Sequence, residues 1–230
     1  MIVYPEDWHK VGQEIELADI EDVLLEILAG IHCDNLSFSG GIDSSLLLYY
    51  LLKLGRKVKT FTVGIGENHP DVDYARMVIV HFERTFQVKI GSEAFIIPDR
   101  FTGDVAVAKY YDRLSHKIDS IIAGDGVDEF MAGYYAHQEM PSDEVYYGCL
   151  RRLQYEHLMP LNENSGKVKV YLPYIDRRLI YLMSQIPLED KVDYYDRKKL
   201  MVELAQGKLP QEVIERKKYG FCTSSEKVAV

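Results

Sequence analysis

The segment Ser39-Gly40-Gly41-Ile42-Asp43-Ser44-Ser45 decides the fold of this 230-residue chain. A short stretch before it, Asn35–Phe38, has the length of a strand, and a leucine-rich stretch after it, 44–54, has helical spacing. Two glycines let the backbone turn sharply, and a helix start presents free N–H groups and a partial positive charge. A strand, a glycine-rich turn and a helix in this order predict a loop that binds phosphate.

The loop differs from a Walker A loop, which has the pattern GxxxxGK[ST] and a lysine that reaches the β- and γ-phosphates. No lysine occurs in 39–45, so a γ-phosphoryl transfer gains no support. The hydroxyls of Ser39, Ser44 and Ser45 add hydrogen-bond donors, and Asp43 is suited to hold a magnesium ion that bridges the phosphates. The alternative is a serine- and glycine-rich turn that only caps a helix. This alternative is disfavoured, because all seven residues of 39–45 fit a phosphate loop and lie between a predicted strand and a predicted helix.

Strands and helices alternate through the first half of the sequence. We expect helices over 19–28, 44–54, 70–83 and 98–114, and strands over 35–38, 57–63, 86–90 and 120–123. This alternation predicts βαβ units, and therefore an α/β fold with a doubly wound parallel sheet.

The character of the sequence changes after Gly133. Helices are expected over 143–158, 176–186 and 198–206, and only 168–172 has an extended pattern. We therefore divide the chain into an N-terminal extension (1–18), an ATP-binding α/β core (19–135) and a smaller, mainly helical part (136–230) that completes the active site.

The composition excludes several classes of function. With 27 basic and 36 acidic residues the formal net charge is -9, which gives no general attraction to nucleic acid or to an anionic membrane. The three cysteines form no CxxC pair and the seven histidines no HExxH motif, so we predict reduced thiols and no zinc or iron–sulfur site. The basic runs 151–152, 177–178 and 197–199 are expected to be solvated helix faces.

The first nine residues include Pro5, Glu6 and Asp7 where a signal sequence would be apolar, and the longest apolar stretch, 46–52, is too short to span a bilayer. We therefore expect a soluble, cytoplasmic protein. The 17 tyrosines suit core packing or a homo-oligomer interface.

The phosphate loop resembles the PP-loop of the N-type ATP pyrophosphatases, which include asparagine synthetase, NAD synthetase, GMP synthetase and tRNA-modifying enzymes. Three further segments are similar to the synthetase domain of asparagine synthetases. They are 123–129 with Gly133-Tyr134 (similar to SGEGxDE…GGY), 172–177 (similar to a P-F-L-D stretch) and 216–221 (similar to R-x-K-x-G-F). The segments occur in the family's order, and the resemblance covers roughly residues 18–222.

This resemblance implies an ATP-dependent, AMP-forming amide ligase that adenylates a carboxylate, releases pyrophosphate and passes the acyl group to ammonia or an amine. It assigns nucleotide binding to Ser37, Ser39, Gly40, Gly41, Asp43, Ser44, Ser45, Val63, Gly64 and Gly124, with the backbone of Val63 and Gly64 recognising adenine. It assigns magnesium to Asp43 and Asp128, and catalysis to Lys218, Asp125 and Glu129. Lys218 would stabilise charge at the α-phosphate. Asp176 is expected to cap a helix.

The sequence also departs from the family pattern. Ile2 stands where glutamine-using synthetases carry a cysteine nucleophile, which implies that nitrogen comes from ammonia, a substrate amine or a separate glutaminase partner. Asp125 replaces a glutamate, which moves a carboxylate by about an ångström, and Ala123 replaces a serine. The resemblance implies that the substrate carboxylate is aspartate or a relative. An NAD-synthetase-like enzyme, a tRNA-modifying PP-loop enzyme and a non-catalytic ATP- or AMP-binding regulatory subunit stay open as alternatives.

Overall fold

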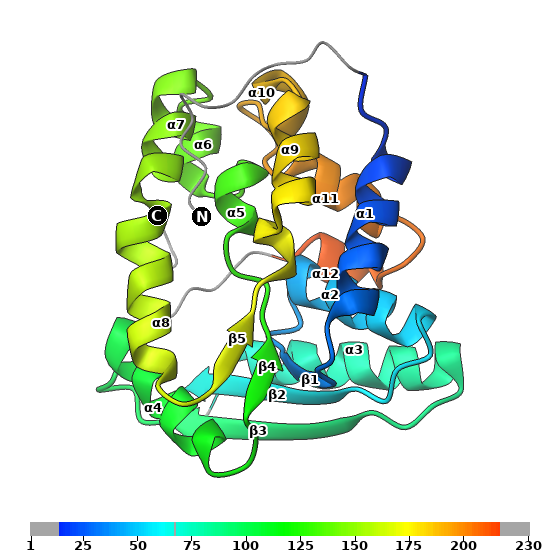
Figure 1. Ribbon diagram of the computed structural model, residues 1–230, viewed down its shortest axis with the longest axis vertical. Helices are drawn as coiled ribbons and strands as arrows, with labels where there is room; N and C mark the ends of the chain where they lie inside the picture. The colour runs from blue at the N-terminus through cyan, green and yellow to red at the C-terminus, as the bar shows by residue number, and fades with distance from the viewer. Residues whose placement is uncertain (1–13, 67, 217–230) are drawn as a thin grey trace. The chain divides into compact units, whose positions relative to one another are not determined.

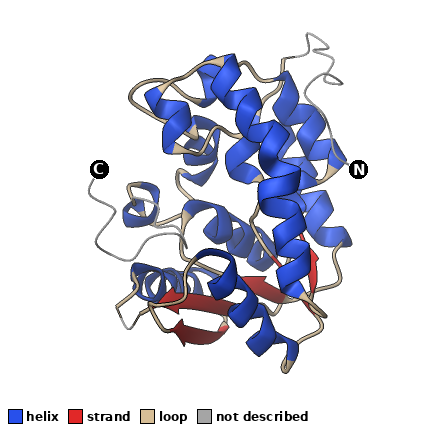
Figure 2. Ribbon diagram, turned by 90° about the vertical axis from the view of Figure 1, so that its left-hand side faces the viewer, coloured by secondary structure: helices blue, strands red, loops and turns tan. Residues whose placement is uncertain are grey.

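Five parallel strands form one sheet in the order β3-β2-β1-β4-β5. A computed structural model describes residues 14–66 and 68–216. Its strands are β1 (Asn35–Ser37), β2 (Lys59–Ile65), β3 (Gly91–Ile97), β4 (Ser120–Ile122) and β5 (Lys169–Tyr171). They lie in one layer, red in Figure 2, and the sheet twists so that β4 and β5 run across the direction of β2 and β3 in Figure 1. The predicted α/β class with a parallel sheet is confirmed.

The chain forms two compact units. The sheet unit contains residues 31–123, 161–171 and 205–216, and the helical unit contains residues 14–30, 124–160 and 172–204. The predicted linear division at residues 18 and 135 stays a prediction. None of the helices in the described ranges is both long and apolar enough to cross a membrane.

Helices cover both faces of the sheet. The helices of the sheet unit are α2 (Ile42–Lys53), α3 (Pro70–Phe86), α4 (Gly103–Ser115) and α12 (Gln211–Ile214). On one face, Phe61, Val63 and Phe95 pack against Tyr110 and other buried residues of α4. On the other face, a side chain at Gly64 would meet Val72 at the start of α3. This arrangement follows from right-handed crossovers, because the β3–α4–β4 connection runs in the opposite direction along the sheet.

Packing between α2 and α3 holds the phosphate-loop helix in place. Leu46, Leu47 and Leu48 of α2 are fully buried. Tyr49 of α2 contacts the rings of Phe82 and Phe86 of α3 at centroid distances of 6.1 and 5.5 Å. A helix start that has to bind a ligand is thereby carried on a rigid element.

The helical unit contains α1 (Leu17–Gly30), α5 (Val127–Phe130), α6 (Tyr135–Glu139), α7 (Asp143–Arg152), a π-helical turn η2 (Leu153–Leu158), a 3₁₀ turn η3 (Pro173–Ile175), α9 (Arg177–Gln185) and α10 (Leu188–Lys191). Two of the boundaries between the units fall inside helices, one within α8 (Met159–Ser165) and one near the end of α11 (Lys199–Ala205). Helix α1 packs on α9 and η3 through the buried face that contains Leu24 and Leu28. The predicted cap at Asp176 is confirmed, since its Oδ1 accepts from the Arg178 N–H at 3.0 Å.

Two strand predictions need comment. The predicted third strand, 86–90, was wrong: α3 continues to Phe86, Gln87 ends it in a left-handed conformation (φ 54°), and the strand is Gly91–Ile97. The extended stretch 168–172 contains β5, which joins the sheet as a fifth strand parallel to β4, with Ser120 opposite Lys169.

Candidate active site

The phosphate loop lies where the strand order of the sheet reverses. β1 pairs with β2 on one side and with β4 on the other, so the chain leaving β1 emerges at a topological switch point. Ligands of doubly wound folds bind outside the carboxyl ends of the strands at such a point. The loop Ser39–Gly41 connects β1 to α2 there.

The two glycines of the loop have different surroundings. Gly40 has a φ of +69°, and a side chain on it would collide with the backbone of Tyr74 and Ala75 in α3. Gly41 is the N-cap residue of α2 and provides no side-chain cap to the helix. The first turn of α2 therefore directs its N–H groups and the positive end of the helix dipole toward the loop, as phosphate binding requires.

Within the part of the chain that the structure describes, the hydroxyls of Ser39 and Ser44 make only long hydrogen bonds. Ser44 Oγ lies 3.3 Å from Ser39 N, from Ser39 Oγ and from the Gly41 carbonyl. Hydroxyl hydrogen bonds are most favourable near 2.7–2.8 Å. Ser45 is fully buried, and its Oγ has no hydrogen-bond partner among the described residues. The close contact of Gly40 with α3, an uncapped helix start and weakly engaged hydroxyls together fit a polyphosphate.

The remaining predicted nucleotide residues lie on β1 and β2. Ser37, at the end of β1, accepts a hydrogen bond from the Tyr110 hydroxyl at 3.3 Å. β2 pairs with β1 only as far as Phe61, whose carbonyl accepts from the Phe38 N–H at 2.8 Å. Backbone groups of successive residues point to alternate edges of a strand, so the N–H and C=O of Val63 point to the same edge of β2 as those of Phe61. At Val63, however, β1 has already ended and does not cover this edge. This backbone edge is suited to an adenine, whereas the Val63 side chain belongs to the core.

An acidic loop in the helical unit is built around Asp128. The loop begins at Gly124, and Gly126 has a φ of +90° with no room for a side chain beside Ile175. A side chain at Gly133 would collide with the Asp128 carboxylate, and the Gly133 N–H donates to the Asp128 carbonyl at 2.7 Å. Asp128 is buried, whereas the predicted catalytic residue Asp125 is exposed.

The carboxylate of Asp128 forms a buried ion pair. Lys198 Nζ lies 2.6 Å from its Oδ1, and the two side chains are only 7% and 10% exposed. Lys198 has a left-handed backbone (φ 61°), a strained conformation for a residue with a side chain. The prediction that the basic run 197–199 is a solvated face was therefore wrong for Lys198, because its ammonium compensates a buried carboxylate.

The predicted catalytic residue Glu129 lies in a polar cluster of the same unit. The Tyr134 hydroxyl donates to its Oε1 at 2.7 Å, and Nδ1 of His157, on the π-helical turn η2, lies 3.8 Å from that oxygen. Burial raises the pKa of the Glu129 carboxyl, and the hydrogen bond from Tyr134 opposes part of this effect. Burial also raises the pKa of Tyr134, so this hydroxyl keeps its proton and stays a donor.

The predicted magnesium ligands Asp43 and Asp128 have the carboxylate chemistry that magnesium prefers. Asp43 lies in the first turn of α2 beside the loop. Asp128 already holds Lys198, so a metal has to share or replace that ammonium. No group of three or more His, Cys, Asp or Glu side chains is assembled for a metal within 14–66 and 68–216. Magnesium does not require one, because it keeps several waters and takes phosphate oxygens as ligands.

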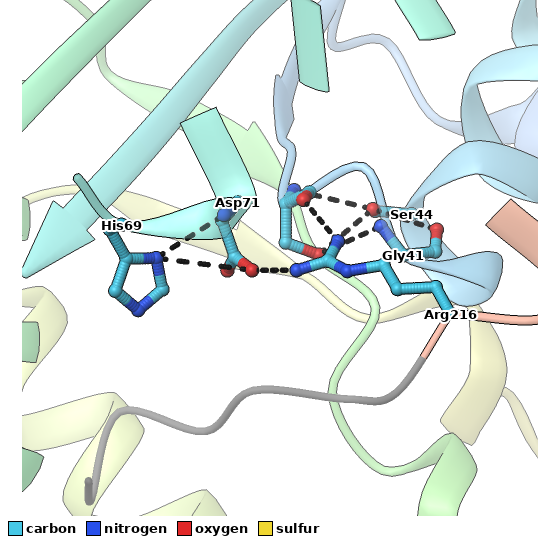
Figure 3. A network of polar contacts seen from close by, with 6 residues as sticks. Gly41, Ser44, His69, Asp71 and Arg216 are labelled. Carbon is cyan, nitrogen blue, oxygen red and sulfur yellow. Dashed lines mark hydrogen bonds and ion pairs between the residues drawn. The ribbon is translucent and has the colours of Figure 1, made fainter. Parts of the chain in front are cut away.

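The structure adds a site residue that the sequence patterns did not reveal. Arg216 donates from Nη1 to the carbonyl of Ser39 at 2.9 Å and forms an ion pair with Asp71 at the start of α3 (Figure 3). Arg216 is the first residue of the R-x-K-x-G-F match. The predicted catalytic residue Lys218 lies outside the described residues.

A parallel sheet with a glycine-rich phosphate loop at its switch point defines a nucleotide-binding α/β protein. Comparison with known families is more specific: the asparagine synthase model matches residues 36–168 and 165–229. The chain belongs to the asparagine synthase family.

Two curated relatives agree with this assignment. An "Asparagine synthetase [glutamine-hydrolyzing]" of Gallus gallus is 27% identical over 217 residues, which cover 80% of this chain and 38% of the relative. An "Asparagine synthetase [glutamine-hydrolyzing] 2" of Lotus japonicus is 25% identical over 256 residues, which cover 94% of this chain and 43% of the relative. The chain therefore spans about two fifths of the length of these relatives.

Proposed function

We propose that the protein is an ATP-dependent, AMP-forming amide ligase that activates a small carboxylate and transfers it to ammonia or an amine. The observation that carries this proposal is the phosphate loop: it lies at the switch point of the sheet, opens onto an uncapped helix and contains no lysine. Such a loop binds a polyphosphate without the side chain that Walker A loops direct to the γ-phosphate. Cleavage between the α- and β-phosphates suits this arrangement.

The reaction has two steps. A carboxylate oxygen of the substrate bonds to the α-phosphorus of ATP while the bond to the β-phosphate's bridging oxygen breaks, and pyrophosphate leaves. The nitrogen of ammonia then bonds to the acyl carbon, AMP leaves with the former carboxylate oxygen, and the nitrogen loses a proton.

Each predicted residue has a role in this scheme. The loop 39–45 holds the phosphates, and Lys218 stabilises the charge that develops at the α-phosphate. We assign Asp43 and Asp128 as magnesium ligands, and the metal, when bound, offsets charge on the phosphates. We assign the exposed Asp125 to receive the incoming amine, whereas Glu129 is buried and held by Tyr134. Aspartate is the leading candidate substrate, with a separate glutaminase as a candidate source of ammonia.

The test is to incubate the protein with ATP, magnesium, ammonium and a panel of carboxylates led by aspartate, and to quantify AMP and pyrophosphate. Lys218→Ala should abolish pyrophosphate release, and Lys217→Ala is the matched control from the same basic run. Production of ADP and phosphate instead would contradict cleavage between the α- and β-phosphates.

Two other outcomes point to the alternatives. Turnover with deamido-NAD would identify an NAD-synthetase-like enzyme. ATP binding without any turnover would favour a regulatory subunit, and the shortened carboxylate at Asp125 gives this alternative its basis.

A further inference from the structure

The guanidinium of Arg216 connects two loops of the sheet unit. Its Nη1 donates to the Ser39 carbonyl at 2.9 Å, and its Nη2 pairs with the carboxylate of Asp71 in the first turn of α3. The guanidinium also lies over the ring of Tyr74, 4.2 Å from the centroid. Figure 3 shows the Arg216 side chain extending between the phosphate loop and Asp71. The Arg216 and Asp71 side chains are only 4% and 9% exposed, so this is a buried ion pair rather than a surface ion pair.

The next turn of α3 contacts the phosphate loop as well. Gly40, the residue after Ser39, lies so close to the backbone of Tyr74 and Ala75 that a side chain would not fit. Arg216 therefore fixes the carbonyl at the start of the loop, while the close contact of Gly40 fixes the next peptide. Together they set the direction in which the backbone enters α2, and this direction decides where the N–H groups of the loop point.

We propose that Arg216 is a positioning residue for nucleotide binding: it ties the Ser39 carbonyl to Asp71 and so holds the phosphate loop in the conformation that accepts ATP. This inference rests on the proposed binding of ATP at the loop. It also links the loop to the start of the segment 216–221, because Arg216 is the first residue of that segment.

An arginine suits this position better than a lysine. The guanidinium is planar and carries several donors in a fixed fork, so it bonds a carbonyl and a carboxylate at once and stacks on a ring. A lysine keeps the charge, but its donors all lie on one nitrogen without the fixed fork that spans the carbonyl and the carboxylate, and it has no planar group to stack on Tyr74. Arg216→Lys should therefore keep part of the ion pair with Asp71 but hold the phosphate loop less firmly.

The test measures the dissociation constant for ATP by calorimetry, together with the melting temperature, for the full chain. Arg216→Met should weaken ATP binding at least tenfold, and Arg216→Lys should weaken it less. The matched control is Arg56→Met. Arg56 is a similar anchor in the sheet unit, bonded to Asp34 and to the carbonyls of Ile31 and Cys33, but it lies at the opposite end of β1 from the loop. Arg56→Met should lower the melting temperature and leave ATP affinity within twofold.

A double variant separates positioning from stability. In Asp71→Asn/Arg216→Met the uncompensated carboxylate is gone, so the melting temperature should recover toward the wild-type value. ATP affinity should stay weak, because the contact to the Ser39 carbonyl is still missing. If pyrophosphate release is measured, Arg216→Lys should raise the KM for ATP more than it lowers kcat.

The outcomes are distinct. Wild-type ATP affinity in folded Arg216→Met, or in Arg216→Lys if the first variant does not fold, would overturn the positioning role and leave the proposed function intact. A wild-type protein that does not bind ATP would overturn the proposed function and the inference that rests on it.

Discussion

Lys198 and Lys199 are adjacent in the chain but have different surroundings. Lys198 pairs with buried Asp128, whereas Lys199 pairs with Asp193 at 2.6 Å at a position where both side chains are about a third exposed. Removing one partner of a buried pair leaves an uncompensated charge, which costs about 3–5 kcal/mol. An exposed pair contributes far less, because water and salt screen it.

We therefore predict that Lys198→Met lowers the free energy of unfolding by about 3–5 kcal/mol, measured with urea at pH 7. Lys199→Met is the control and should cause only a small change. The double variant Asp128→Asn/Lys198→Met should be more stable than Lys198→Met, because no buried charge is left without a partner. If Lys198→Met and Lys199→Met lower the free energy of unfolding equally, burial is not what makes the ion pair of Lys198 stabilising.

His137 gives a prediction for how the stability of the protein depends on pH. Its side chain is 1% exposed, its Nδ1 accepts from the Tyr134 N–H at 3.2 Å, and burial lowers its pKa from 6.5 to about 4. Between pH 6.5 and pH 4, His137 is protonated in the unfolded chain but stays neutral in the folded protein. The stability from neutral His137 is therefore complete above pH 6.5 and is lost as the pH falls toward 4.

Unfolding with urea should show a loss of about 2 kcal/mol between pH 7 and pH 5 that is due to this residue. His137→Asn, which keeps an acceptor near Nδ1, should remove this part of the pH dependence. The same substitution at exposed His32 is the control and should leave the pH profile as it is in the wild type. An unchanged profile in His137→Asn would mean that other groups cause the loss.

At the scale of elements, two glycines should respond in opposite ways to alanine. Gly126 has a φ of +90°, and a methyl group there would collide with Ile175. Gly148 lies inside α7, and a methyl group would meet nothing within 4 Å. We predict that Gly126→Ala destabilises the protein by at least about 1–3 kcal/mol, and that Gly148→Ala stabilises it by about 0.5–1 kcal/mol. Thermal unfolding of both variants measures this, and a stable Gly126→Ala would contradict the left-handed loop.

The elements also show what the sequence could predict. Periodicity located α1, α2 and β4 closely, and the loop 39–45 indicated its own strand and helix. Periodicity failed at 86–90, because apolar and polar residues alternate there as they do in a half-buried strand, although the segment contains the end of a helix and the turn after it. Here the left-handed conformation of Gln87 decides the boundary, and a residue other than glycine gives no signal for it.

Candidate site residues could be proposed from the sequence only where chemistry and spacing coincide in one segment, and their roles stay predictions. Asp43, Asp128 and the loop glycines lie in such segments. Arg216 and Lys198 were not recognised, because each sits in a basic run and its carboxylate partner lies 145 or 70 residues away. Only the fold brings such partners together, so single-sequence patterns cannot distinguish them from solvated cations.

At the scale of the whole molecule, charge gives the last prediction. The net charge is -9, and cations that formed basic runs in the sequence are engaged with carboxylates: Lys198 with Asp128, Arg216 with Asp71 and Arg178 with Asp176. Non-specific binding to nucleic acid depends on Lys and Arg side chains that neutralise phosphates and release counterions. We therefore predict no measurable tRNA binding at low salt, where such binding is strongest.

Filter binding or fluorescence anisotropy with bulk tRNA at about 50 mM and about 200 mM salt tests this, because binding through many phosphates weakens steeply over that range. A basic tRNA-binding protein assayed in parallel shows that the tRNA is competent. Saturable, salt-sensitive binding would require a patch of cations that the paired residues do not supply, and would favour the tRNA-modifying alternative. Its absence, with pyrophosphate released in the presence of a small carboxylate, would exclude the tRNA-modifying alternative and support the amide ligase.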